Sequence, residues 1–484
     1  MMEDLTLLTD MYQLMMASAY FKAGLHEKEA VFHLFFRKRP FHGGFAIAAG
    51  LESVVQFLEG FKYHPSDLEY LAGLNDQEGN PYFDDEFLKW LETFQFACDV
   101  DAMEEGTPVF PHEPLVRVKG PLAQAQLMES PLLNLINFPT LIATKAARIR
   151  LAAEDDQVLE FGLRRAQGID GALTASRSAY IGGCDATSNV LAGKRFGIPV
   201  KGTHAHSWVM VFEDEEEAFK TYAKAQPGST VFLVDTYDTI EGVKKAIEVG
   251  DWLRKEGRKF LGVRLDSGDL AYLSIEARRL MDEKGFHDAK IVASNELDET
   301  IIADLKRQGA QITVWGVGTN LVTSANQPAL DGVYKLSALK EGDGYRDTLK
   351  LSEQLGKLSN PGILQVRRFE KGGQYLADMI WDEKAFDESV SAKIVDPLDP
   401  TQEREIPSDW VGKDLLKPIF KSGKKVYDLP DLKTIKARTE LELKKLHSGT
   451  KRFMNPHKYV VGMESGFLTR KLDLVRKLRR KSRS

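Results

Sequence analysis

Residues 260–269 read FLGVRLDSGD, so the hydrophobic run Phe260–Val263 leads directly into an arginine, two aspartates and a glycine. Three other hydrophobic runs, Thr230–Val234, Lys290–Ala293 and Gln311–Val314, also end in small clusters of polar or glycine residues. A helical pattern follows every run except the last, which predicts a repeat of strand, polar corner and helix. In α/β barrels such strand ends face one common opening where ligands bind. Core packing does not require charged and glycine residues at four strand exits, so we expect a shared anionic ligand there.

The bulk composition is that of an ordinary soluble enzyme. The chain has 484 residues, 43% of them hydrophobic and 28% charged, and is long enough for two domains or one barrel with additions. A net charge of −6 argues against general nucleic-acid binding. Two cysteines suit a reducing compartment, and no basic signal segment or apolar membrane-spanning run is present. We therefore expect a cytoplasmic protein that binds neither nucleic acid nor membrane.

The rest of the chain divides into helical and β-rich stretches. Helices are predicted at Thr9–Ala23, Phe45–Leu58, Ser130–Ala153, Asp170–Ala179 and Thr187–Phe196, and strands at Val31–Arg37, Val158–Phe161 and Ile198–Lys201. The segments Val100–Met128 and Lys350–Phe369 have the short strands and turns of a β-domain, and Gln402–Ser484 has polar helical patterns. β-rich parts on both sides of the central region indicate one discontinuous domain; the alternative is two separate satellite domains, which would give a similar sequence pattern.

Arg164 and Arg165 follow the strand predicted at Val158–Phe161. The planar fork of a guanidinium can hold a carboxylate or a phosphate, so this pair is a candidate anion-binding site. The alternative is a solvated pair of surface charges that contributes little.

Two histidines lie in the segment Gly202–Ser207 (GTHAHS), which follows the strand predicted at Ile198–Lys201. His204 and His206 could bind a metal ion, or one of them could accept a phosphoryl group as a nucleophile. No third ligand stands nearby at a suggestive spacing. The alternative is one ordered, hydrogen-bonded histidine and one solvent-exposed histidine.

Arg264, Asp266 and Asp269 lie within six residues. The aspartates could hold ribose hydroxyls or a Mg²⁺ ion that bridges phosphate oxygens. The alternative is a Ser-Gly turn with Asp269 as a helix N-cap. That alternative explains Asp269 but leaves Arg264 and Asp266 without a role, so we favour a functional interpretation.

Gly316-Val317-Gly318-Thr319 follows the last hydrophobic run. Two glycines let backbone N–H groups converge on an anion, and a following helix start adds a favourable dipole. Such a short motif is weak evidence alone, but its place late in the strand series is typical of phosphate sites. Tyr12, by itself, is simply an aromatic residue on a helix.

Together these motifs resemble the nicotinate phosphoribosyltransferase family. The residues that carry the resemblance are Thr9–Gln13, Phe161–Gln167, Gly202–Ser207, Val263–Asp269, Ser294–Asp298, Gly316–Thr319 and, near the end of the chain, Arg452–Tyr459. The resemblance implies an α/β fold of the type II phosphoribosyltransferase kind, which is an irregular α/β barrel with a discontinuous N-terminal α/β sandwich domain. It places the sandwich in residues 1–135, the barrel in 136–339 and the completing segments in 340–484.

The same resemblance implies a reaction. Nicotinate and 5-phosphoribosyl 1-diphosphate would give nicotinate mononucleotide and diphosphate, with coupled ATP hydrolysis, expected Mg²⁺ and a homodimeric enzyme. Residue by residue, it implies nicotinate contacts from Tyr12, Thr203, Arg264, Arg164 and Arg165, donor contacts from Gly316, Gly318 and Thr319, and phosphorylation of His206. From chemistry we add Asp266 as a donor contact and Asp266 and Asp269 as metal ligands.

Three alternatives remain at this stage. An enzyme for nicotinamide would need an acidic acceptor near the ring, where the sequence offers cations and hydroxyls. A sugar-phosphate aldolase or isomerase on a similar barrel would need a Schiff-base lysine or a carboxylate base at a strand exit. A ligand-binding protein without catalysis would not need the intact histidine, arginine and aspartate clusters.

Overall fold

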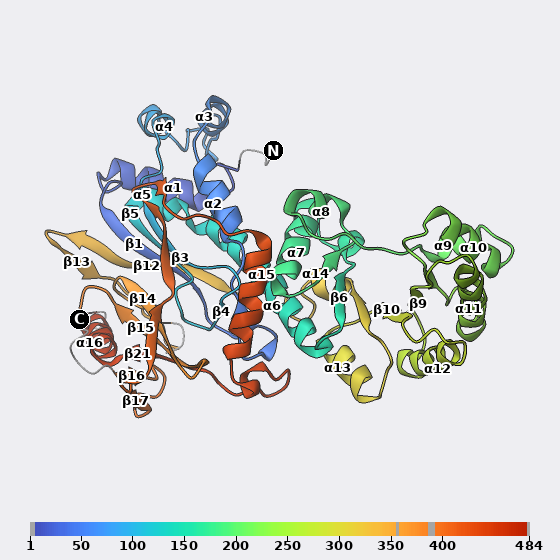
Figure 1. Cartoon of the computed structure of the whole chain (residues 1–484). Helices are drawn as coiled ribbons and strands as arrows, with labels where there is room; N and C mark the ends of the chain where they lie inside the picture. The colour runs from blue at the N-terminus through green and yellow to red at the C-terminus, as the bar shows by residue number, and fades with distance from the viewer. Residues whose placement is uncertain (1–4, 355–357, 386–392, 482–484) are drawn as a thin grey trace. The chain divides into compact units, whose positions relative to one another are not determined.

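The computed structural model describes residues 5–354, 358–385 and 393–481 and divides the chain into two compact units. The central unit comprises Ile142–Pro328, and the terminal unit combines Met1–Leu141 with Ala329–Ser484 (Figure 1). The domain limits near residues 135 and 339 that the resemblance implies stay a prediction.

The central unit contains a six-stranded parallel sheet with the order β7-β6-β11-β10-β9-β8. Its strands are β6 (Gln157–Glu160), β7 (Ala186–Thr187), β8 (Val231–Leu233), β9 (Gly262–Leu265), β10 (Lys290–Ala293) and β11 (Val314–Val317). The described residues leave β7 and β8 at the two edges, so closure into a barrel stays a prediction. The α/β class is confirmed.

The four hydrophobic runs of the central region lead to strands β8 to β11, but β9 and β11 are shifted toward the polar segments relative to the predicted runs. Strand β9 begins at Gly262 and includes Arg264, which pairs with Val292 of β10. Strand β11 begins at Val314 and includes Gly316. The ends of these strands are set by backbone hydrogen bonds to the neighbouring strands. Hydrophobicity alone does not predict those bonds. The functional residues therefore lie inside the ends of the strands as well as after them.

Helices follow the strands as predicted and begin at aspartate caps. The helices of the central unit are α7 (Ile169–Gly182), α8 (Val190–Phe196), α9 (His206–Met210), α10 (Glu215–Ala225), α11 (Thr239–Lys255), α12 (Leu270–Glu283), α13 (Glu299–Arg307) and α14 (Thr319–Val322). Asp238, Asp269 and Asp298 each accept a backbone N–H from the first turn of α11, α12 and α13. These caps fix where each polar corner turns into its helix.

Two local predictions in the central unit are wrong. The helix predicted from Thr187 begins at Val190, because Thr187 belongs to β7 and Asn189 caps the helix. The strand predicted at Ile198–Lys201 is reduced to one parallel bridge between Val200 and Thr187. A short apolar run in the sequence does not show whether the segment forms a full strand or a single bridge.

The terminal unit is built from two larger sheets and the helices that pack on them. The seven-stranded sheet has the order β13-β12-β1-β5-β3-β19-β20, and the six-stranded sheet has the order β17-β16-β21-β15-β14-β18. Strands of the first sheet are β1 (Glu29–Phe36), β3 (Asp99–Met103), β5 (Val116–Pro121), β12 (Gly332–Glu341), β13 (Gly344–Asp347), β19 (Leu416–Lys421) and β20 (Lys424–Lys425). Those of the second are β14 (Leu364–Lys371), β15 (Gln374–Asp382), β16 (Lys393–Val395), β17 (Glu403–Glu405), β18 (Val411–Asp414) and β21 (Val460–Glu464). One sheet thus contains strands from both ends of the chain.

The helices of the terminal unit match the predictions only in part. The helices are α1 (Met11–Lys22), α2 (Leu51–Gly60), α3 (Pro65–Ala72), α4 (Asp85–Glu92), α5 (Leu122–Leu127), α15 (Leu432–Lys445) and α16 (Ser465–Lys481), while α6 (Glu129–Ala153) continues into the central unit. The helix predicted from Phe45 begins only at Leu51, after β2 (Ala46–Ile47), which pairs with β4 (Pro108–Val109). Residues 403–425, predicted as helical, form four strands because they pair with β3, β14 and β16.

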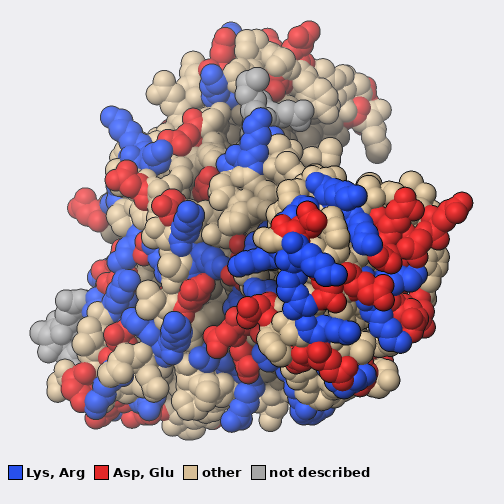
Figure 2. All heavy atoms as spheres, turned by 45° about the vertical axis from the view of Figure 1, so that its right-hand side comes forward, with Lys and Arg blue, Asp and Glu red and all other residues tan. Residues whose placement is uncertain are grey.

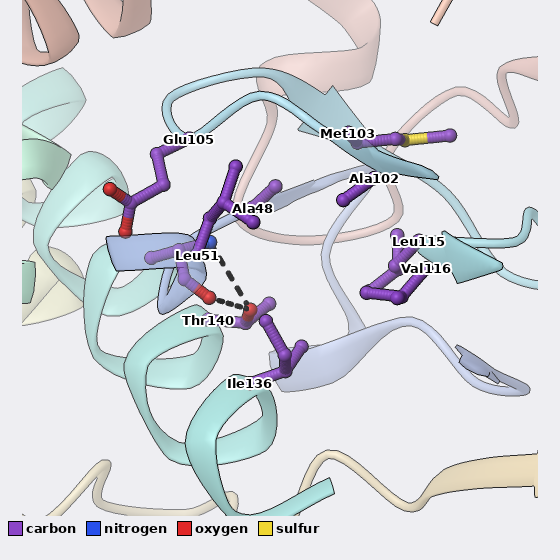
Figure 3. Close-up of a pocket in the computed structure, with 10 residues that line it drawn as sticks. Ala48, Leu51, Ala102, Met103, Glu105, Leu115, Val116, Ile136 and Thr140 are labelled. Atoms are coloured by element: carbon purple, nitrogen blue, oxygen red, sulfur yellow. Dashed lines mark hydrogen bonds between the residues drawn. The ribbon is translucent and has the colours of Figure 1, made fainter. Parts of the chain in front are cut away.

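A small cavity lies inside the terminal unit, between α2, α6 and the sheet residues Ala102 and Val116 (Figure 3). Its volume of about 10 Å³ is enough for one water molecule at most. Beside it, the Thr140 hydroxyl bonds both backbone groups of Ala49, and the Gly50 N–H donates to Glu105 at 2.7 Å. The cavity is therefore too small for a substrate.

The surface is mixed in charge. Lysine and arginine side chains alternate with aspartate and glutamate over the face that Figure 2 shows. Nothing on this face resembles the basic stripe that nucleic acid requires. In the described part of the chain, every helix is too short or too polar to cross a membrane.

A glycine holds α11 against the sheet. A Cβ at Gly242 would lie 2.0 Å from the carbonyl oxygen of Val234, whereas a Cβ at Gly171 in α7 would meet nothing within 4 Å. We expect Gly242→Ala to lower the free energy of unfolding by roughly 1–3 kcal/mol through overpacking. Gly171→Ala should raise it by up to about 1 kcal/mol, because alanine favours helix. Urea denaturation followed by circular dichroism measures both changes, and equal effects would contradict this account.

Candidate active site at the carboxyl ends of the parallel strands

Arg264 is held by partners from three different segments. Its Nη1 donates to the Thr203 hydroxyl at 3.0 Å, its Nε donates to the Ser294 hydroxyl at 2.9 Å, and its Nη2 donates to Asp266 Oδ1 at 3.1 Å. The side chain is 16% exposed. A guanidinium has five N–H donors, so two remain for a ligand. The arrangement can bind an anionic group with a fixed orientation.

Asp235 joins this cluster to His206. The Asp235 side chain is 1% exposed and follows β8. Its Oδ1 lies 3.1 Å from His206 Nε2, and its Oδ2 accepts the Asp266 N–H at 2.8 Å and the Ser267 hydroxyl at 2.7 Å. His206 is the first residue of α9 and is 39% exposed. It makes no other hydrogen bond with the described residues, so its Nδ1 can meet a ligand.

Glu160 fixes the loop that carries the arginine pair. This fully buried carboxylate ends β6 and accepts the Gly162 N–H at 2.5 Å, the Ser176 hydroxyl at 2.9 Å and the Thr187 hydroxyl at 2.5 Å. The next residues after Gly162 include Arg164 and Arg165, which are exposed and form no ion pair with a described residue. Their guanidinium groups are therefore available to an anion.

Gly316 in β11 and Gly318 just after it have a packing role. A Cβ at Gly316 would lie 2.8 Å from the Phe161 ring, and one at Gly318 would lie 3.2 Å from the Phe161 carbonyl oxygen. Close contact between β11 and β6 therefore accounts for Gly316 and in part for Gly318. Thr319 begins the short helix α14. A phosphate contact from this segment stays a prediction.

Two of the alternatives raised from the sequence are found in the structure. His204 is buried, and its Nε2 accepts the backbone N–H of Leu233 at 3.2 Å, so it is the ordered histidine of the pair. Burial lowers the pKa of His204 to about 4. Asp269 caps α12 by accepting the Tyr272 N–H at 3.0 Å. Among the described residues, no group of three or more histidine, cysteine or acidic side chains could hold a metal ion.

The structure brings most of the predicted site residues to one edge of one sheet. Thr203, His206, Arg264 and Asp266 share a hydrogen-bonded network through Asp235 and Ser294. The arginine pair and the Gly316–Thr319 segment lie at the carboxyl ends of the neighbouring strands β6 and β11. Sequence reasoning did not assign roles to Asp235, Ser294 and Glu160, although the first two belong to the polar clusters at the strand exits.

Sequence comparison decides the family. Three patterns match in chain order: the nicotinate phosphoribosyltransferase N-terminal domain over residues 7–137, the family pattern over 157–351 and the C-terminal domain over 365–471. A nicotinate phosphoribosyltransferase of Bacillus subtilis is 43% identical over 488 residues, which cover 99% of this chain and 96% of that protein. The chain belongs to the nicotinate phosphoribosyltransferase family. The human member is 35% identical and covers 94% of each chain.

Solved structures agree with this membership of the nicotinate phosphoribosyltransferase family. The crystal structure of human nicotinic acid phosphoribosyltransferase matches with a TM-score of 0.82 and 32% identity, over 97% of this chain and 99% of that one. A nicotinate-nucleotide pyrophosphorylase from Pyrococcus furiosus matches with a TM-score of 0.69 and 23% identity, over 92% and 97% of the two chains. The second match shows a shared fold. The family resemblance read from the sequence is confirmed.

Tyr12 is the predicted site residue that lies outside the central unit. It is on α1 of the terminal unit and is 48% exposed. Partial burial and the nearby carboxylate of Glu129 raise the pKa of its hydroxyl, so the group stays protonated at neutral pH. Its contact with a substrate ring stays a prediction.

The buried side chain of His204 makes the free energy of unfolding depend on pH. Because the folded pKa of His204 is about 4, the unfolded chain takes up a proton there as pH falls below 6.5 and the folded chain does not. The free energy of unfolding should therefore fall, by about 2 kcal/mol for this group between pH 7 and 5. His204→Gln, whose amide oxygen can accept the Leu233 N–H, should remove that part of the slope in urea denaturation. An unchanged slope in His204→Gln would show that the folded protein accepts the proton.

Proposed function

We propose that this protein is a nicotinate phosphoribosyltransferase that works in NAD biosynthesis. It transfers the 5-phosphoribosyl group of 5-phosphoribosyl 1-diphosphate to the ring nitrogen of nicotinate, and it couples this step to ATP hydrolysis through phosphorylation of His206. The observation that carries the proposal is the Arg264 guanidinium, which three neighbours orient while two of its donors stay free. Family membership supports the same reaction.

Arg264 gives the site its preference for an acid. A bidentate contact between a guanidinium and a carboxylate is stronger than a contact with a neutral amide. The nearest carboxylate, Asp266, accepts hydrogen bonds from Arg264 and Ser294 at Oδ1, and its charge is offset by the same guanidinium. These contacts favour nicotinate over nicotinamide. Thr203, held by the same guanidinium, lies where it can contact the ring.

His206 is suited to accept the phosphoryl group of ATP. With the Asp235 carboxylate at Nε2, the proton of the neutral ring resides on Nε2 and the lone pair is on Nδ1. Attack by Nδ1 on the terminal phosphorus of ATP forms the N–P bond and breaks the bond to the ADP oxygen. The Asp235 carboxylate stabilises the positive charge that develops on the ring. Hydrolysis of the phosphohistidine resets the enzyme after each transfer.

The transfer step depends on positioning. The ring nitrogen of nicotinate is already nucleophilic, so no strong base is required. Arg164 and Arg165 hold the anionic substrates, and the Gly316–Thr319 segment lies beside the donor phosphate. Asp266 and Asp269 each keep a carboxylate oxygen without a hydrogen bond to a described residue, which fits the one or two carboxylates that Mg²⁺ uses beside substrate phosphates. When bound, Mg²⁺ would neutralise charge on the departing diphosphate.

The proposal includes the finer properties implied by the family. These are the type II arrangement of an irregular barrel and an α/β sandwich, a homodimer, and a cytoplasmic location suited to two free, buried cysteines. The decisive experiment measures nicotinate mononucleotide formed from nicotinate and the phosphoribosyl donor, with and without ATP. Nicotinamide in place of nicotinate should give a much lower rate, and equal rates would contradict the assignment.

Removing the oriented guanidinium should weaken nicotinate binding. We expect Arg264→Ala to cost about 1.5–3 kcal/mol, the usual value of a hydrogen bond to a charged group, seen as a raised KM for nicotinate. Arg279→Ala is a matched control, because Arg279 is exposed on α12 and its ion pairs with described residues are those to Glu276 and Glu283. An unchanged nicotinate affinity in Arg264→Ala would remove this residue from the site.

Replacing the phosphorylated histidine should uncouple ATP from transfer. His206→Ala should retain some ATP-independent product formation and lose stimulation by ATP, since the phosphoryl acceptor is gone. His204→Gln serves as the control because it alters the neighbouring histidine and keeps Nδ1 of His206. Radiolabel from the terminal phosphate of ATP should appear on the parent protein and not on His206→Ala. Equal ATP stimulation of parent and His206→Ala would refute the role.

A further inference from the structure

A second cavity lies in the terminal unit, among strands β14, β18 and β19, helix α15 and the loop after β3. Figure 1 shows α15 beside the sheet that contains β14 and β15. The volume of the cavity is about 290 Å³, close to the lower end of the range of small-molecule sites, roughly 300–1,000 Å³. It shares no residue with the site at the strand ends of the central unit.

The cavity has more cations than carboxylates. Its walls carry five arginine and lysine side chains and three glutamates. Each glutamate is already engaged: Glu104 with Arg438 at 3.0 Å, Glu370 with Lys445 at 2.9 Å, and Glu442 with the Tyr375 hydroxyl at 2.5 Å. Lys413 and Lys417 have no ion-pair partner among the described residues, while the Glu442 carboxylate lies 4.0 Å from the nearest guanidinium nitrogen of Arg368.

The backbone register places like charges together. Arg368 of β14 lies directly opposite Lys413 of β18, on the same face of the antiparallel pair. Like charges in this arrangement destabilise a sheet. Arg368 is 2% exposed and pairs with Asp378, but its Nη1 has no hydrogen-bond acceptor, and the nearest carboxylate oxygen, on Glu442, is 4.0 Å away. Asp378 offsets the charge of Arg368, so the unsatisfied group is the Nη1 donor of this buried guanidinium.

We infer that this cavity binds a small phosphomonoester, whose phosphoryl group lies between Lys413 and Lys417. A phosphoryl group carries nearly two negative charges and three acceptor oxygens, which matches two lysines without partners beside a buried arginine. The unsatisfied Nη1 of Arg368 adds a hydrogen-bond donor in the cavity wall. The remaining volume accommodates the organic part, with the carboxylates of Glu104 and Glu370 as acceptors for hydroxyl groups.

Lysine footprinting of the full chain tests this site directly. An amine-acetylating reagent is applied at constant ionic strength with chloride, inorganic phosphate, malonate or ribose 5-phosphate, and mass spectrometry reads the acetylation of each lysine. Ribose 5-phosphate should protect Lys413 and Lys417 by about tenfold, the factor expected from one charged hydrogen bond at each lysine, and at lower concentration than inorganic phosphate. Lys424 and Lys444, exposed lysines of the same unit outside the cavity, are internal controls. Equal acetylation in chloride and in ribose 5-phosphate would overturn the site.

The comparisons with malonate and inorganic phosphate test which class of ligand the cavity binds. Equal protection by malonate would overturn the phosphoryl assignment, and stronger protection by inorganic phosphate than by ribose 5-phosphate would overturn the organic part. In calorimetry, the double variant Lys413→Gln/Lys417→Gln should lose ribose 5-phosphate affinity at this site, and the charge-matched Lys424→Gln/Lys444→Gln should keep it. Footprinting of the parent protein shows whether the cavity binds ribose 5-phosphate even if the double variant does not fold.

The test is independent of the proposed function. Nicotinate mononucleotide formation is measured separately on the same proteins, and the Lys413→Gln/Lys417→Gln variant should keep it. A parent protein without turnover would refute the proposed function and leave the footprinting result standing. A parent protein with turnover and no protection of Lys413 or Lys417 would refute the cavity alone.

Discussion

The buried carboxylate of Asp235 is the interaction on which the candidate site depends. It connects the exit of β8 to His206 at the start of α9 and to the turn after β9 through the Asp266 N–H and Ser267. A buried carboxylate is stable only when it is hydrogen-bonded, so folding of the sheet requires these segments to be in place. The same contact that stabilises the sheet edge therefore orients the histidine.

Arg264 extends this constraint to two more segments. Its side chain reaches Thr203 and Ser294, and its partner Asp266 is the residue whose backbone Asp235 holds. The guanidinium is therefore ordered before any substrate arrives, and binding does not have to supply the free energy of ordering it. An anion that meets Arg264 meets donors of fixed direction, which is the usual origin of electrostatic selectivity in enzyme sites.

The sequence predicts the chemistry of this site better than its geometry. Hydrophobic runs followed by polar residues locate the strands, and the polar clusters include Asp235 and Ser294. Their partners depend on the strand order β10-β9-β8, which a single sequence does not specify. Glu160 has no signal beyond its place at a strand end, because its role is to accept donors from the loop after β6, from α7 and from β7 together. Gly316 was read as a phosphate contact, but the nearby Phe161 ring already requires glycine there.

Strands shared between the two ends of the chain have a consequence for biogenesis. A hydrogen bond from Ser422 to Asp99 spans 323 residues, and β19 completes the sheet that β1, β3 and β5 begin. The terminal unit therefore cannot finish folding until β19 has left the ribosome. Strands β1, β5 and β3 can pair with one another earlier, but the outer edges of β1 and β3 must wait for β12 and β19. The central unit is one continuous segment with mostly nearby pairings, so it can form during translation. Nascent chains that stall before β19 would expose the edge of β3, a natural target for chaperones.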